Sequence, residues 1–179
     1  MEKIKSRLPT KEAITPVLAV ISFLAYGWTL VLFLWKVPSW MLYLTAGDML
    51  TVLAYSMTSA LLESLFVLSV LLLLCLLLPA RWMQDVFVTR GTVAAILGLG
   101  TIMLYMYCFS LVGYSYISNL IPWSLAGLVI TIFFTSLSTR IRPIVRAAEL
   151  ISDRMIVFLY IYIPISLVSL LVVVYRNLF

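Results

Sequence analysis

Residues 57–78 read MTSALLESLFVLSVLLLLCLLL and are followed by Pro79 and Arg81. The stretch is apolar over about 20 residues, which is the length that an α-helix rising 1.5 Å per residue needs to cross a hydrocarbon core of about 30 Å. Its one charged residue, Glu63, lies towards the first end of the run. The stretch therefore predicts a transmembrane helix that ends at Pro79.

Four further apolar runs resemble this one in length and composition. The five predicted spans lie at about 13–35, 57–78, 92–113, 120–137 and 155–175. The chain is 64% hydrophobic and 11% charged, against about 25% charged in an ordinary soluble domain. Five spans use most of its length, so we expect a single all-α polytopic membrane domain over 1–179 with no separate soluble domain.

The basic residues alternate between the two sides of this map. Ten of the twelve fall on one side: Lys3, Lys5, Arg7, Lys11, Arg81, Arg90, Arg140, Arg142, Arg146 and Arg154. Only Lys36 and Arg176 fall on the other side. Short cytoplasmic loops carry an excess of Lys and Arg, so the N-terminus is expected inside and the C-terminus outside. The first run is longer than the apolar core of a signal peptide and is interpreted as a retained span.

Two segments between the spans predict short interfacial helices. Residues 37–50 are apolar but interrupted by Pro38 and Gly47, which favours a helix lying in the outer interface; a re-entrant segment or an extended start to the second span is the alternative. Asp48 is expected to cap a helix there. Residues 140–153 carry charges on one face and apolar residues on another, which is typical of a helix on the inner surface.

The packing signals in the sequence are small residues. Ala25 with Thr29, and Ala94 with Gly98, stand four residues apart and predict close approach between helices. No heptad run is evident, and Pro164 is expected to kink the last span.

Glu63 is the one charged residue inside a predicted span, and Ser56 and Ser59 share its helical face. A carboxylate in hydrocarbon is costly, so the three residues are a candidate intramembrane polar site for a proton or cation. The alternative places Glu63 near the outer boundary, where it reaches headgroups or a neighbouring span.

The arginines between the last two spans are candidates for contact with anionic lipid. They are Arg140, Arg142, Arg146 and Arg154. Basic residues beside a span attract phosphate-bearing headgroups as well as setting orientation. The net charge of +5 is explained by this placement, so nucleic acid is not an expected partner.

The sequence contains no His, and Cys75 and Cys108 both fall inside apolar runs. Neither a metal site nor an imidazole-ligated cofactor is expected from this composition. No nucleotide-binding or hydrolase motif is present either, so we expect no cofactor and no catalytic residues.

These observations favour a non-enzymatic accessory, assembly or anchoring subunit that acts through helix packing with a protein partner or a second copy. A small transporter or channel for an ion or lipid, using Glu63 with Ser56 and Ser59, is the main alternative. An enzyme acting on lipid through Glu63 or the arginines is a third. The short loops favour a bacterial inner membrane.

Overall fold

The computed structural model describes residues 9–79, 83, 86–112 and 116–178, which form long α-helices and, within these ranges, no strand. The helices are α2 (Lys11–Trp40), α3 (Ala46–Leu77), α5 (Phe87–Val112), α6 (Tyr116–Ser138) and α7 (Arg142–Leu178). All five are long and apolar enough to cross a membrane. The fold therefore fits the all-α integral membrane protein that the sequence predicts.

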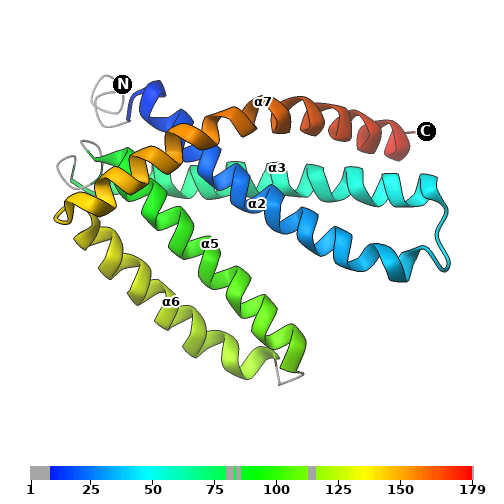
Figure 1. The fold of residues 1–179 in the computed structure, drawn as a ribbon, viewed down its shortest axis with the longest axis horizontal. Coiled ribbons are helices and arrows are strands. Elements are labelled where there is room, and N and C mark those ends of the chain that lie inside the picture. Colours follow the sequence, from blue (N-terminus) through cyan, green and yellow to red (C-terminus); the bar gives the residue numbers. More distant parts are fainter. Residues whose placement is uncertain (1–8, 80–82, 84–85, 113–115, 179) are drawn as a thin grey trace.

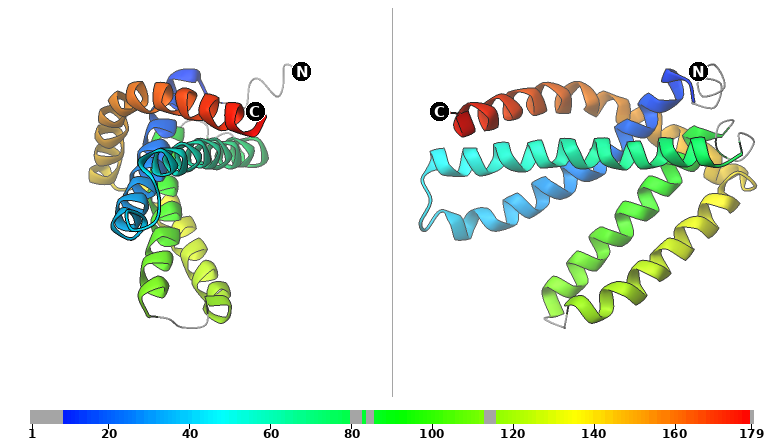
Figure 2. Two further views of the ribbon diagram at one scale, coloured as in Figure 1. Left: turned by 90° about the vertical axis from the view of Figure 1, so that its right-hand side faces the viewer. Right: turned by 180° about the vertical axis from the view of Figure 1, so that it is seen from behind.

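The five helices form two arms that meet at one end (Figures 1 and 2). The three-helix arm contains α2, α3 and α7, and the second arm is the α5–α6 hairpin, which diverges from the first. The end of α3, the start of α5, the end of α6 and the start of α7 gather where the arms meet, and we call this the junction end (Figure 1). Because spanning helices tilt by up to about 40°, two diverging arms can both cross a bilayer.

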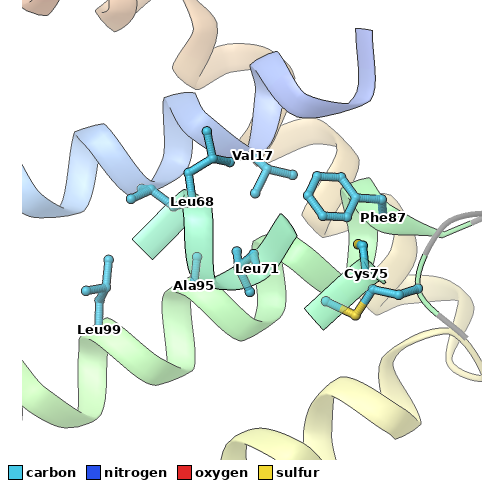
Figure 3. Close-up of a cluster of buried hydrophobic side chains, with 9 residues drawn as sticks. Val17, Leu68, Leu71, Cys75, Phe87, Ala95 and Leu99 are labelled. Carbon is cyan, nitrogen blue, oxygen red and sulfur yellow. The ribbon is translucent and has the colours of Figure 1, made fainter. Parts of the chain in front are cut away.

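A buried apolar cluster holds the two arms together at the junction end (Figure 3). It comprises Val17, Ile21, Leu68, Leu71, Cys75, Met83, Phe87, Ala95 and Leu99. Gly91 of α5 lies beside it, where an added Cβ would come within 3.1 Å of Val17 Cγ1. A glycine at this position therefore lets α5 approach α2 closely.

The buried residues of α7 follow a seven-residue spacing. Its five buried residues are Ala148, Ser152, Leu159, Ser166 and Ser169. All five fall in one series of alternating three- and four-residue steps, and most buried positions of α3 follow the same spacing from Ala54 to Cys75. A heptad spacing of this kind is typical of helices that cross at about 20°. The sequence analysis found no heptad run because a heptad is usually recognised by large apolar residues. In α7 the residues that recur every seven positions are mostly alanine or serine.

Aromatic and hydroxyl groups complete the three-helix arm. Tyr26 of α2 stacks on Tyr162 of α7 with ring centroids 4.6 Å apart. The Tyr26 hydroxyl forms a hydrogen bond with Ser166 Oγ, which also donates to the Tyr162 carbonyl at 2.5 Å. At the far end of the arm, Asn177 Nδ2 donates to the Tyr55 hydroxyl at 3.0 Å. These contacts join α7 to α2 near its middle and to α3 near its end.

The α5–α6 hairpin packs through residues spaced by four. Trp123, Gly127, Thr131 and Thr135 form the half-buried to buried stripe of α6. A Cβ at Gly127 would lie 3.2 Å from Thr101 Oγ1, and the Trp123 indole N–H donates to the Thr101 carbonyl at 3.1 Å. The predicted close approach at Gly98 is not found, because a Cβ there would meet nothing within 4 Å.

The structure differs from the predicted interfacial segments. Residues 37–40 continue α2, a turn follows, and α3 begins at Ala46, so 37–50 contain no separate helix. Residues 142–153 are the first turns of α7, which runs without a break through Pro164 to Leu178. The predicted helices appear as extensions of the spans because nothing in either sequence stops helical hydrogen bonding at the expected span boundary.

Asp48 takes part in a helix cap but is not the N-cap residue, which corrects the sequence prediction. Thr45 is the N-cap of α3, and its Oγ1 accepts from the Asp48 backbone N–H at 3.2 Å. The Asp48 carboxylate in turn accepts from the Thr45 N–H at 3.3 Å. This reciprocal pair is a capping box, and it fixes where α3 begins.

Part of the charge count falls on residues that the structure does not describe, namely Lys3, Lys5, Arg7 and Arg81. The start of α2 and the end of α7 lie at opposite ends of the three-helix arm (Figure 1). Which end faces the cytoplasm stays a prediction from charge.

Candidate functional site

Two of the three residues predicted to form a polar site lie together in a groove. Ser56 and Ser59 of α3 face α2 across a groove of about 270 Å³. Its lining residues are Thr29, Leu32, Phe33, Lys36, Trp40, Ser56 and Ser59. Glu63 is exposed one turn further along α3 and is not part of the lining. The site is therefore a serine groove with Glu63 beside it.

The groove also contains a cation that the sequence analysis did not connect with it. Lys36 comes from α2, and it reaches the serines because α2 and α3 are antiparallel neighbours joined by a short turn. Thr29 joins it from two turns earlier on α2. Antiparallel pairing of the two helices was the available signal, but the predicted interfacial helix at 37–50 obscured it.

The four candidate arginines surround the start of α7. Arg140 lies in the turn after α6, Arg142 begins α7, and Arg146 follows one turn later. Arg154 lies two turns beyond Arg146. All four are exposed, and none forms an ion pair with another described residue. Their guanidinium groups are thus accessible to an anion at the junction end.

Arg90 is the residue that the sequence analysis missed. It was counted there as a loop charge, but the structure leaves it 8% exposed in the first turn of α5. Its Nη2 donates to Thr139 Oγ1 at 3.1 Å, which links α5 to the end of α6. A buried arginine near hydrocarbon is costly unless polar groups surround it. The hydroxyl-rich end of α6, with Thr135, Ser138 and Thr139, was the signal that could have found it.

A pocket opens beside Arg90 at the junction end. It has a volume of about 330 Å³. It is lined by Ala13, Val86, Phe87, Val88, Thr89, Thr139, Val145 and Glu149. Four chain segments contribute, and the lining combines one carboxylate, two hydroxyls and five apolar residues. This composition suits a small amphiphilic group better than a bare ion.

On α2 and on α5, a line of apolar residues along one side of the helix is buried at the junction end and exposed further along the helix. On α2, Val17 and Ile21 are buried in the cluster shared with Ala95 and Leu99 of α5, and Leu24 packs against it. The same stripe continues on α2 to Val31 and Trp35, which are 57% and 53% exposed. On α5 it continues to Ile102 and Met106, which are 57% and 37% exposed.

We call Val31, Trp35, Ile102 and Met106 the open stripes. They keep the three- and four-residue spacing of the packed halves, and they belong to the second halves of α2 and α5, which diverge from each other (Figure 1). In agreement with this divergence, α2 has no buried residue after Tyr26. Both helices thus present a packing face without a helix against it.

The described residues contain no group of three or more Cys, Asp or Glu side chains placed to hold a metal ion. Cys75 is buried in the cluster at the junction end, and Cys108 lies in the last two turns of α5, at the opposite end of that helix from the junction. Their helical positions keep them far apart along the bundle axis.

Searches against protein-family models, curated proteins and solved structures give no match to this chain.

Proposed function

We propose that this protein is a non-enzymatic membrane subunit that holds the transmembrane helix of a partner between its two arms. It would serve as an accessory, assembly or anchoring component. The observation that carries the proposal is the pair of open stripes, Val31 with Trp35 on α2 and Ile102 with Met106 on α5. These stripes continue a packed interface past the point where its two helices separate.

The physics of helix association in lipid supports this role. Lipid tails are as apolar as leucine, so helices associate in membranes through close van der Waals packing more than through the hydrophobic effect. A face with regular packing spacing is therefore more informative than exposed apolar area. On the open stripes the spacing continues while the contact stops, which is the arrangement that a partner helix would complete.

In this proposal, the α5–α6 hairpin forms one side of the binding site for the partner helix. Trp123 bonds to Thr101, and Gly127 lets α6 lie directly on Thr101. At the junction end, Arg90 ties α5 to Thr139. These contacts hold α5 and α6 together while leaving the open stripe of α5 uncovered.

Photocrosslinking in native membranes tests the proposal. A benzophenone amino acid is introduced at Val31 or at Ile102, with Leu171 on the outer side of α7 as the matched exposed control. We expect one discrete protein adduct of the same mass from both open-stripe positions and none from Leu171. An adduct of twice the chain mass would identify a second copy as the partner. Lipid adducts alone at all three positions, with the chain extracted without a stoichiometric partner, would contradict the proposal.

A second measurement asks whether the arms simply close on each other. Val31→Cys and Ile102→Cys are combined in a chain whose Cys75 and Cys108 are replaced by alanine. A disulfide needs Cα atoms within about 7 Å, so we expect no rapid crosslink if a partner helix separates the arms. Fast, complete oxidation would mean that the open stripes meet in the membrane and leave no room for a partner.

The serine groove favours a second candidate function, a small transporter or channel for an ion or lipid. Ser56 and Ser59 lie in one groove with Lys36, and Glu63 follows on the next turn. If this function holds, Glu63→Gln lowers flux in proteoliposomes, whereas Glu12→Gln at the other end of α2 leaves it unchanged. Equal flux in the two variants would remove this candidate.

We place the protein in a bacterial inner membrane with the junction end towards the cytoplasm. The support is the charge distribution, since Arg90, Arg140, Arg142 and Arg146 all lie at that end. Alkaline phosphatase fused after Phe179 should then be active, because it folds only outside the cytoplasm. An inactive reporter on a stable fusion would reverse the assignment.

A further inference from the structure

In a bilayer spanned by α5 and α6, the junction pocket would lie near the depth of the lipid headgroups in either orientation. Its walls are the first turn of α5 and the residue that follows the end of α6. These helices contain 26 and 23 residues, or about 39 and about 35 Å at 1.5 Å per residue. Because the hydrocarbon core is about 30 Å thick, both ends of each helix reach the headgroup layer.

The pocket carries a carboxylate where the surrounding surface is basic. Glu149 lines it from α7, and its carboxylate forms no ion pair or hydrogen bond with another described residue. Arg146 precedes Glu149 by three residues and Arg142 by seven, so all three share one side of α7. A negative group thus lines the cavity, and two exposed positive groups outside the lining lie on the same side of α7.

The remaining lining supplies hydroxyls and an apolar floor. Thr89 and Thr139 place hydroxyls in the pocket, and Arg90 holds Thr139 in position by donating to its Oγ1. Ala13, Val86, Phe87, Val88 and Val145 provide the apolar lining. A volume of about 330 Å³ falls at the small end of ligand pockets, which suits a headgroup with its glycerol backbone and the first carbons of the acyl chains.

We propose that this pocket binds the headgroup of an aminophospholipid. The phosphate lies against Arg142 and Arg146, the primary ammonium donates hydrogen bonds to the Glu149 carboxylate, and the apolar lining contacts the upper part of the acyl chains. This assignment is independent of what occupies the open stripes.

Glu149 is the residue that makes the site selective. A phosphatidylethanolamine ammonium has three N–H donors, whereas the quaternary ammonium of phosphatidylcholine has none. Phosphatidylglycerol carries the phosphate without a cation, so the Glu149 carboxylate repels it. Since a hydrogen bond between charged groups corresponds to a difference in affinity of at least about tenfold, ethanolamine should be preferred over choline by about tenfold or more.

The test measures the lipid-induced shift in thermal unfolding of the full chain in detergent. The lipids are phosphatidylethanolamine, phosphatidylcholine and phosphatidylglycerol of the same acyl chains. In Glu149→Gln, stabilisation by ethanolamine lipid should fall to the choline level, and stabilisation by glycerol lipid should rise. Asp153→Asn, one turn further along α7 and outside the pocket lining, should retain the original order. Arg146→Gln should weaken binding of all three lipids.

The opposite changes for two lipids separate a binding role from a structural one, because a misfolded variant would lose stabilisation by every lipid. Water-soluble phosphoethanolamine serves as a further arm and should not stabilise the protein, since it lacks the chains that the apolar lining contacts. Equal stabilisation by all three lipids, no change in Glu149→Gln, or equal stabilisation by phosphoethanolamine alone would overturn the proposal.

Discussion

The three-helix arm and the α5–α6 hairpin are both made of apolar helices, yet they pack by different spacings. In the arm, the buried residues of α3 and α7 recur every seven residues and include Ser64, Ser152 and Ser166. In the hairpin, α6 contacts α5 every fourth residue, with Gly127 at the closest approach. Seven-residue spacing is typical of crossings near +20°, and small residues four apart are typical of crossings near −40°.

The difference explains why the molecule has two arms. A heptad spacing of buried residues runs along α3 and α7 within the three-helix arm, and the bond between Asn177 and Tyr55 joins the two helices at its far end. The α5–α6 contact at Trp123, Gly127 and Thr101 lies outside the junction cluster that joins the hairpin to the arm. The hairpin therefore has a packing contact of its own. Where it diverges from the three-helix arm, the open stripes are exposed.

The largest effect should come from enlarging a residue in the arm seam. Ser152 is fully buried, and Ser152→Leu forces a branched side chain between helices, which should destabilise the protein by about 3 kcal/mol. Unfolding by SDS from bicelles measures the change. Val157→Leu, on an exposed position of the same helix, should be close to neutral. Equal stability of the two variants would show that the seam does not carry the arm.

The hairpin counterpart should be somewhat less sensitive. Gly127→Leu places a side chain against Thr101 and should cost about 2 kcal/mol. Gly98→Leu is the matched control, because Gly98 has open space where its Cβ would be. Hydrogen exchange should report loosening in α5 and α6 and leave α3 and α7 protected. Loosening of all five helices would instead mean that the two arms unfold as one unit.

The smallest effect concerns the hydroxyl contact between α2 and α7. Tyr26→Phe keeps the ring stack on Tyr162 and removes the hydrogen bond to Ser166. Interhelical hydrogen bonds in membranes average about 0.6 kcal/mol, so the same SDS titration should detect a change of that size. Tyr160→Phe on the exposed face of α7 should give none. A decrease of several kcal/mol in the free energy of unfolding would contradict this prediction and would mean that the Tyr26–Ser166 hydrogen bond is a major contributor to the stability of the arm.

The approximate positions of the spans could be predicted from the sequence, because the free energy of transferring a segment into lipid is roughly the sum of contributions from its individual residues. The run ending at Leu78 and the existence of a first span follow from this alone, although α2 at Lys11–Trp40 extends beyond the predicted 13–35. The helix ends were less predictable. The boundary at Ala46 depends on the capping box of Thr45 and Asp48, and the first turns of α7 continue without interruption into its span.

The candidate sites were less accessible from the sequence. Ser56 and Ser59 could be placed on one face, but Lys36 joined them only through the pairing of α2 with α3. Arg90 was classed with the loop charges, since nothing in its neighbours along the chain distinguishes a buried arginine from a surface one. Its partner Thr139 is 49 residues away.

The sequence by itself predicted five apolar helices long enough to span a membrane, and the described residues contain five such helices, because transfer into lipid is an additive property of short segments. It also offered two small-residue pairs, Ala25 with Thr29 and Ala94 with Gly98, as candidates for close helix approach. The tertiary structure decided which small residues are used, choosing Gly127 over Gly98. It also decided that the hairpin leaves the arm, and that Glu149 and Arg90 lie beside one pocket. In lipid, both faces of a helix are apolar, so hydrophobicity cannot mark the packing face, and shape complementarity between distant segments decides it.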